Sequence, residues 1–279
     1  VLHQTGTKML IDVHAHLDLY SENIDTVFEE IKQHQIITVS NSVDLDSYQH
    51  NCEVAGRSNL VIPIFGVHPI NASKYAGNLQ QLDEAMESSP IFGEVGLDFK
   101  FVEEASQASD QKAVFEYLLE AASNQNKYVI VHSKETDAEV LKLIEKHDIQ
   151  NVIMHWFTGT QEVFRRLIDR GAFFTIGADV LYSIKTQQMA REIPEDQLLT
   201  ETDNPLVSLN LPDTLAMPRA LIDIVKELAR QRGSTEMEMV QTMERNFMSI
   251  IQSTPTLSKF SKKRARAFKN RRYSRQTQL

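Results

Sequence analysis

Six side chains of the types that bind metal ions occur along the chain, each at the end of a short apolar run typical of a β-strand. Side chains alternate between the two faces of a strand, so His14 and His16 point the same way and can bind one ion together. Four imidazoles and two carboxylates delivered by five such runs predict a metal-centred active site. The six candidate ligands are His14, His16, Glu94, His132, His155 and Asp203.

The number of these ligands indicates two metal ions. A catalytic zinc ion is satisfied by three protein ligands and a water molecule, so six ligands exceed a single site. Two ions about 4 Å apart, bridged by a carboxylate and a hydroxide, would use all six. We expect Glu94 to bridge the ions, with His14 and His16 on one ion and His132 and His155 on the other. The candidate ions are Zn²⁺, Mn²⁺ and Mg²⁺.

Two of the six side chains are assigned to catalysis. Glu94 is expected to hold both ions in place, and Asp203 is expected to ligate metal and to orient the attacking water. Two neighbouring dications lower the pKa of water toward neutrality, so hydroxide would form at physiological pH.

Three further side chains are candidates for contacts with a substrate. His68 ends a strand-like run and has no obvious partner in the sequence. Lys134 lies two residues after a candidate ligand and could hold a phosphate, although it could also be a solvated lysine. Asp98 lies four residues beyond the expected bridging carboxylate and would position substrate, support a ligand or cap a loop. Trp156 could stack on a base, but packing within the fold is the stronger interpretation.

The elements that must position these residues alternate between strand and helix patterns. Ile24–His34 is an example of a segment with helical periodicity between two strands, and two further helices are expected at Pro218–Arg232 and Thr235–Ile251. Continuous apolar runs are typical of parallel strands that are buried on both faces. The eight expected strands are Met9–Val13, Ile36–Ser40, Val61–Val67, Pro90–Gly93, Tyr128–Val131, Asn151–Met154, Ala172–Ile176 and Gln197–Thr200.

Eight strands separated by helices over about 250 residues predict an α/β fold, the (β/α)8 TIM barrel. Active sites in this fold lie at the C-terminal ends of the strands, which is where the six candidate ligands occur. The pattern therefore connects the fold class directly to the expected metal site.

Composition fits one soluble domain. The chain has 279 residues, of which 42% are hydrophobic and 24% charged, as in ordinary globular proteins. No apolar run approaches the roughly 18 residues of a membrane span, and no signal-peptide pattern opens the chain. Cys52, expected to be a packing residue in a helix, is the only cysteine, so no intrachain disulfide can form. A reducing cytoplasm is the expected location.

Both ends differ from the middle of the chain. Residues 1–8 are expected to be an N-terminal extension, residues 9–253 the barrel domain, and residues 254–279 a disordered basic tail. Nine lysines and arginines and no acid lie from Lys259 onward; without them 20 basic residues face 38 acidic ones, a net charge of −18. The tail is interpreted either as an inert extension, which we favour, or as an electrostatic arm for nucleic acid.

Seven short motifs together resemble the TatD family of metal-dependent hydrolases. The resemblance extends over nearly all of Met9–Ile251 and implies a TIM barrel of the amidohydrolase superfamily with two divalent cations. It also implies phosphodiester hydrolysis, typically 3′→5′ exonuclease action on DNA, and metal binding by the six ligands named above. A deep barrel mouth favours single-stranded DNA or frayed ends over an intact duplex. The motifs, in chain order, are LIDVHAHLD, FGVHP, GEVGLDF, VIVHSK, MHWFTG, IGAD and LLTETDNP.

Two positions depart from the family pattern. Lys134 stands where the family usually has arginine, which reduces a two-pronged phosphate contact to a point charge. The run Trp156–Gly159 replaces the usual Cys-Phe-Ser-Gly and resembles TatD-like proteins of bacterial anti-phage cassettes, so protein partners in a defence complex are a further expectation. The alternatives are a small-molecule amidohydrolase or lactonase, a deacylase acting on an aminoacyl-tRNA ester, and a non-enzymatic subunit of a complex.

Overall fold

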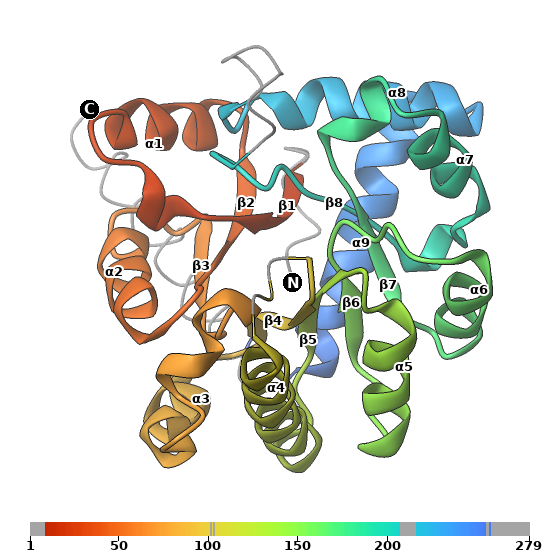
Figure 1. Cartoon of the computed structure of the whole chain (residues 1–279). Helices are drawn as coiled ribbons and strands as arrows, with labels where there is room; N and C mark the ends of the chain where they lie inside the picture. The colour runs from red at the N-terminus through yellow and green to blue at the C-terminus, as the bar shows by residue number, and fades with distance from the viewer. Residues whose placement is uncertain (1–8, 101, 103, 207–215, 255–256, 258–279) are drawn as a thin grey trace.

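Eight parallel strands form the inside of a barrel in the computed structural model, which describes residues 9–100, 102, 104–206, 216–254 and 257. Helices surround these strands, so the predicted TIM barrel is the observed architecture (Figure 1). The strands are β1 (Leu10–Ala15), β2 (Ile36–Asn41), β3 (Val61–Ile64), β4 (Phe92–Asp98), β5 (Val129–Lys134), β6 (Val152–Met154), β7 (Phe173–Ile176) and β8 (Leu198–Thr200).

Helices follow the strands and cover the outside of the barrel (Figure 1). Short 3-10 helices lie in several of the connections, namely η1 (Leu17–Leu19), η2 (Pro69–Lys74), η3 (Leu79–Leu82), η4 (Ala178–Leu181) and η5 (Glu195–Gln197). The α-helices are α1 (Ile24–Gln33), α2 (Leu45–Ala55), α3 (Asp83–Ser88), α4 (Ala105–Gln125), α5 (Asp137–Lys146), α6 (Gln161–Asp169), α7 (Ile184–Glu192), α8 (Ala220–Arg232) and α9 (Glu236–Ser253).

Side chains start two of these helices at defined residues. The Asp44 carboxylate accepts a hydrogen bond from the Ser47 N–H at 3.0 Å before α2. Thr235 and Glu238 bond reciprocally at the start of α9, as a capping box. Such bonds satisfy N–H groups that have no partner within the helix, so the local sequence sets where each helix begins.

The strands pair in chain order in two groups, β1 to β3 and β4 to β8. A single parallel bridge between Phe65 and Phe92 joins the two groups on the β3–β4 side. Both aromatic rings, together with Phe174 of β7, are fully buried in the core. Truncating a buried ring of this kind to alanine lowers the free energy of unfolding by about 3–5 kcal/mol, so these rings contribute strongly to the stability of the barrel.

The barrel closes where the last strand meets the first. The Thr200 hydroxyl donates to the Ile11 carbonyl oxygen at 2.5 Å. Thr202 donates to the Asp12 carboxylate from its N–H at 2.9 Å and from its hydroxyl at 2.7 Å. These bonds, between residues 189 or 190 positions apart, bring β8 and the segment after it alongside β1.

The strand ends differ from those expected from the apolar runs. β4 starts later than the predicted Pro90–Gly93 and continues to Asp98, so Glu94 lies inside the strand rather than after it. β4 and β5 remain paired as far as Asp98 and Lys134, beyond the apolar runs from which the two strands were predicted. β3 ends at Ile64, before the predicted Val67, and the next residue, Phe65, forms an isolated bridge with Phe92.

Cys52 lies in α2, as expected, but it is exposed, so the packing role predicted for it is wrong. Residues 1–8 and all nine basic residues of the tail lie outside the described residues. Among the described helices, none combines the length and apolar character that crossing a membrane requires.

Candidate metal centre

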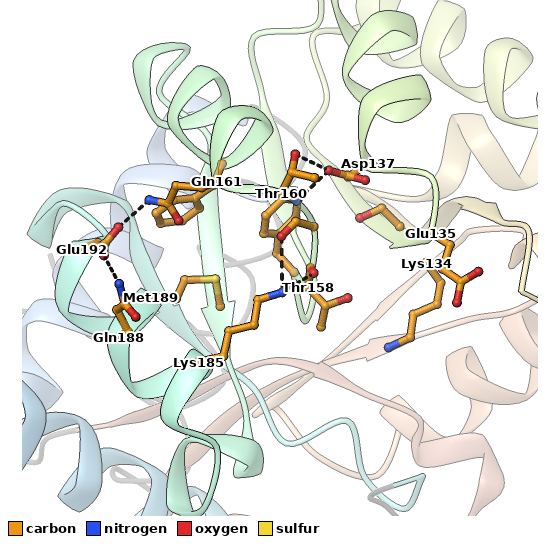
Figure 2. Close-up of a pocket in the computed structure, with 14 residues that line it drawn as sticks. Lys134, Glu135, Asp137, Thr158, Thr160, Gln161, Lys185, Gln188, Met189 and Glu192 are labelled. Carbon is orange, nitrogen blue, oxygen red and sulfur yellow. Dashed lines mark hydrogen bonds between the residues drawn. The ribbon is translucent and has the colours of Figure 1, made fainter.

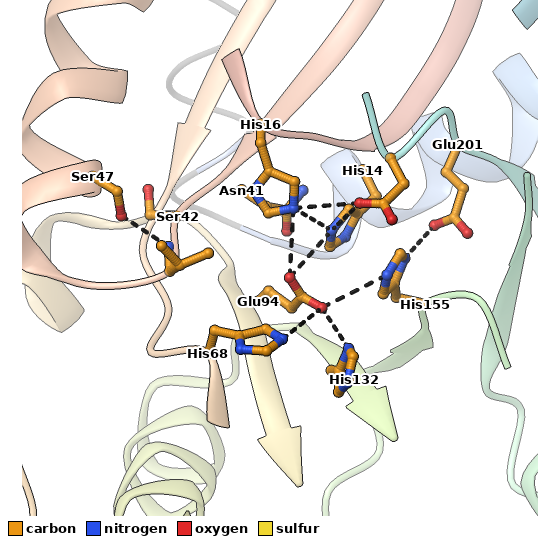
Figure 3. A network of polar contacts seen from close by, with 12 residues as sticks. His14, His16, Asn41, Ser42, Ser47, His68, Glu94, His132, His155 and Glu201 are labelled. Atoms are coloured by element: carbon orange, nitrogen blue, oxygen red, sulfur yellow. Dashed lines mark hydrogen bonds and ion pairs between the residues drawn. The ribbon is translucent and has the colours of Figure 1, made fainter. Parts of the chain in front are cut away.

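Glu94 lies at the middle of a buried cluster of histidines (Figure 3). Its Oε2 atom is 3.5 Å from Nε2 of His14 and 3.5 Å from Nε2 of His16. These two histidines are on β1 and just after it, and their Nε2 atoms are 3.2 Å apart. One carboxylate oxygen of Glu94 therefore faces the first pair of expected ligands.

The other oxygen of Glu94 faces a second group of histidines (Figure 3). Its Oε1 atom lies 2.7 Å from Nδ1 of His132 and 3.6 Å from Nε2 of His155. Nε2 of His68 is 3.8 Å from the same oxygen. The carboxylate thus divides its two oxygens between two groups of imidazoles, which is the arrangement that a bridging ligand needs.

Asp203 lies beside the first pair of histidines, His14 and His16. Its Oδ1 atom is 3.6 Å from Nε2 of His14 and 3.4 Å from Nε2 of His16. Its backbone has a φ of 56°, in the left-handed region, and its N–H donates to the His14 carbonyl oxygen at 2.8 Å. The closure of the barrel therefore places Asp203 against β1.

Two carboxylates hold the second pair of histidines from outside. Asp98 Oδ2 is 3.0 Å from Nε2 of His132, and Glu201 Oε2 is 2.6 Å from Nδ1 of His155. A carboxylate on one ring nitrogen fixes the orientation of the ring and leaves the other nitrogen free to bind metal. Asp98 thus contacts a candidate ligand, and its Oδ1 also accepts a hydrogen bond from the Lys100 N–H in the following loop at 3.0 Å.

Glu201 was not among the residues expected from the sequence. It is fully buried, and besides His155 it accepts a hydrogen bond from the Trp156 N–H at 3.1 Å. The one signal in the sequence is its spacing, because Glu201 precedes Asp203 by two residues and an extended segment places such residues on one face.

The charges of the cluster follow from burial and from these carboxylates. Burial, and after it the neighbouring His155, lowers the pKa of His14 to about 3, so this ring is neutral. Burial also opposes a proton on His155, but Glu201 outweighs it and raises the pKa to about 10. Two bonded carboxylates likewise overcome burial and raise the pKa of His132 to about 9. Protons on these two rings have to leave when an ion binds.

The residues fit divalent metal ions. The ligand atoms of His14, His16 and Glu94 all lie within 4.8 Å of one another, and so do those of His68, Glu94 and His132. Burial penalises the charged form of Glu94, yet the surrounding histidines hold its pKa well below the usual range, so it is a carboxylate. Imidazole and carboxylate are the donors that Zn²⁺ and Mn²⁺ accept.

The three expected substrate contacts lie in different surroundings. His68 is part of the cluster, and its Nδ1 accepts from the Ile70 N–H at 3.2 Å. Asp98 contacts Nε2 of His132 at 3.0 Å. Lys134 lies with its Nζ 5.5 Å from the centre of the Trp156 ring and lines a cavity.

Hydrogen bonds fix Trp156 beside the cluster. Its indole N–H donates to Asp179 at 3.2 Å, and its backbone N–H donates to Thr175 Oγ1 at 3.2 Å. Its ring lies 6.3 Å from that of His155 and also contacts the Lys134 ammonium. The ring therefore packs between a candidate ligand and a candidate phosphate contact.

Comparisons with known proteins agree with this geometry. The family model described as TatD related DNase matches residues 11–252. The chain is 26% identical over 261 residues to human "Deoxyribonuclease TATDN3", covering 87% of this chain and 94% of that protein. It is 29% identical over 214 residues to "Uncharacterized metal-dependent hydrolase YabD" of Bacillus subtilis, covering 72% and 82% respectively. The crystal structure of the TatD homologue YJJV from Escherichia coli superposes with a TM-score of 0.77 at 22% identity, covering 86% of this chain and 97% of that one.

Proposed function

This chain belongs to the family of TatD-related DNases, which are metal-dependent hydrolases, and from that membership we propose that it is a deoxyribonuclease. We assign it 3′→5′ exonuclease action on single-stranded DNA or frayed ends. The observation that carries the proposal is the division of the Glu94 carboxylate between two groups of histidines. Phosphodiester hydrolysis by two metal ions uses a clamp of this kind, with ions about 3.5–4 Å apart.

The ligands divide naturally between two sites. His14, His16 and Asp203 would hold one divalent ion, and His132 and His155 the other, with Glu94 shared. His68 has its Nε2 close enough to contact either the second ion or a phosphate oxygen beside it. When bound, Mg²⁺, Mn²⁺ or Zn²⁺ would lower the pKa of the attacking water and neutralise charge on the phosphate.

The side chains of the cluster supply the remaining chemistry. Burial penalises charge on Asp203, but the hydrogen bond to His16 and the charges of the neighbouring histidines together lower its pKa, so Asp203 is a carboxylate that could orient water and accept its proton. Glu94, His132 and His155 would hold the second ion next to the first. Lys134, whose Nζ lies 5.5 Å from the centre of the Trp156 ring, would attract the phosphate backbone as a point charge.

Apolar side chains at the barrel mouth support a single-stranded substrate. Seven large hydrophobic residues of the described chain are exposed, and five of them follow the C-terminal ends of barrel strands. Bases of a single strand can pack on such side chains, whereas a duplex hides its base faces. The five are Leu19, Ile70, Tyr182, Ile184 and Leu206.

End-labelled DNA tests the proposal. The full-length protein is incubated with single-stranded and matched duplex DNA in Mg²⁺, Mn²⁺ or Zn²⁺, with an ester substrate in parallel. We expect a 3′ label to be released as a mononucleotide and a 5′-labelled strand to shorten stepwise, with EDTA stopping both. Hydrolysis of the ester without cleavage of DNA in any metal would overturn the proposal and favour a deacylase or lactonase.

A further inference from the structure

A cavity of about 730 Å³ lies beside the candidate metal centre (Figure 2). Residues from the end of β5, the β6–α6 connection and α7 line it. Two lining residues follow candidate ligands closely in the sequence, since Lys134 comes two residues after His132 and Phe157 two residues after His155. None of the six candidate ligands lines the cavity, but Lys134 lies 5.5 Å from the centre of the Trp156 ring, which is 6.3 Å from the ring of His155. The volume is that of a small-ligand site, about 300–1,000 Å³.

Part of the wall is apolar. Phe157 and Phe164 are buried and pack against each other with their ring centres 6.1 Å apart, and Met189 of α7 is half-buried beside the opening. Aromatic and thioether side chains of this kind form a surface on which a planar heterocycle can lie.

Two lysines extend into the cavity from opposite sides (Figure 2). Lys134 contacts the Trp156 ring, and Lys185 of α7 donates to the carbonyl oxygens of Thr158 at 2.7 Å and Gly159 at 3.4 Å. In the described part of the chain neither ammonium forms an ion pair with a carboxylate, so both keep their charge available for an anion.

Three acidic residues also line the cavity, and their partners differ from those of the lysines. Asp137 accepts two hydrogen bonds from Thr160, each at 2.8 Å. The Glu192 carboxylate accepts hydrogen bonds from the side chains of Gln161 at 2.6 Å and of Gln188 at 3.0 Å. Glu135 is exposed at the rim. Two of the three negative charges thus face neutral donors within the protein, and the third is screened by solvent.

We infer that this cavity binds one nucleotide of the substrate next to the scissile phosphate. Its base lies against the apolar wall, and a backbone phosphate lies between Lys134 and Lys185. The inference rests on the proposed nuclease function and adds to it a subsite that selects an unpaired nucleotide, because a base held in a duplex is not free to lie against the apolar wall.

Calorimetric titration with deoxyadenosine monophosphate tests the subsite without requiring cleavage. We expect the metal-loaded protein to bind this nucleotide more tightly than deoxyribose 5-phosphate, which has no base. Lys185→Met should weaken nucleotide binding about tenfold, the effect of removing one charge-assisted contact. Lys32→Met, an exposed lysine on α1, is the matched control and should bind as the wild type does.

A second variant, expected to increase nucleotide affinity, distinguishes an effect of charge from damage to the loop. Lys185 also holds two carbonyl oxygens, so its removal could disturb the β6–α6 connection. Glu135→Gln removes an exposed negative charge at the rim and should tighten nucleotide binding, which a disturbed loop cannot do. In DNA cleavage, Lys185→Met should raise KM and leave kcat unchanged.

The outcomes distinguish this inference from the proposed function. Nucleotide binding that responds to both variants, in a protein that cleaves no DNA, would support the subsite and overturn the nuclease assignment. DNA cleavage in which neither variant changes nucleotide affinity or KM would overturn the subsite and leave the nuclease assignment standing.

Discussion

His155 and Glu201 form the tightest polar pair of the second histidine group, with Nδ1 and Oε2 2.6 Å apart and both side chains buried. This contact fixes which nitrogen of the ring faces the centre, because Nδ1–H donates a hydrogen bond to the carboxylate and Nε2 is directed at Glu94. The same carboxylate holds the backbone of Trp156, so one buried acid sets the position of two neighbouring residues.

Glu201→Gln is expected to lower metal affinity by about 10–100-fold while the barrel stays folded. The amide keeps the size of the side chain but provides a weaker acceptor for the imidazole. Metal titration followed by elemental analysis measures the effect, and Glu120→Gln on the exposed face of α4 is the matched control. Unchanged affinity would mean that the pair has no part in metal binding.

Glu94→Ala is expected to abolish metal-dependent hydrolysis, because it removes the group placed to bridge both sites. Elemental analysis should find fewer than two metal ions per chain in this variant. Wild-type metal content together with wild-type activity would rule out the two-metal assignment.

Lys134→Ala is expected to raise KM for DNA several-fold and to leave metal content unchanged, because its ammonium lies by the Trp156 ring rather than among the ligands. Steady-state kinetics and metal analysis on the same preparation check both parts. A loss of metal would show instead that Lys134 supports the centre.

Lys127 gives the stability of the fold a pH dependence of defined sign. Its ammonium is buried and donates to the carbonyl oxygens of Met86 at 2.6 Å and Glu87 at 3.3 Å, and burial lowers its pKa from 10.5 to about 8. Between these two pH values the unfolded chain holds a proton that the folded chain has lost, so the free energy of unfolding should increase with pH.

The variant Lys127→Met should lose this increase, since methionine does not titrate. Denaturant unfolding of wild type and variant, below and within the window, compares the two slopes. An equal increase in both proteins would assign it to other groups.

Deletion of residues 259–279, which lie outside the described residues, tests the basic part of the tail. We expect DNA affinity and its salt dependence to be unchanged, because the helix after β8 that completes the barrel ends before the tail. A salt titration in Ca²⁺ compares full-length and truncated protein. Weaker binding with a flatter salt slope would identify the tail as an electrostatic arm.

The sequence predicts the parts of this molecule that are written locally. Apolar runs followed by histidines predict the strands and the side chains that gather around Glu94, and the barrel follows from the alternation of strands with helices. Glu201 was missed because an acid near a strand end resembles any surface acid until the fold places His155 against it. Lys185 could not be assigned either, since nothing in the sequence of α7 indicates that this side chain contacts the loop before α6.

The bonds between Thr202 and Asp12 have a consequence for how the protein is made. His14 is among the first residues of the domain and Asp203 reaches it only after the eighth strand has emerged, so a nascent or truncated chain lacks part of the centre. A fragment ending after β7 would carry five of the six ligands without the strand that closes the barrel. Hydrolytic capacity would therefore arise late in synthesis and all at once, which would protect a cell from a partly built enzyme.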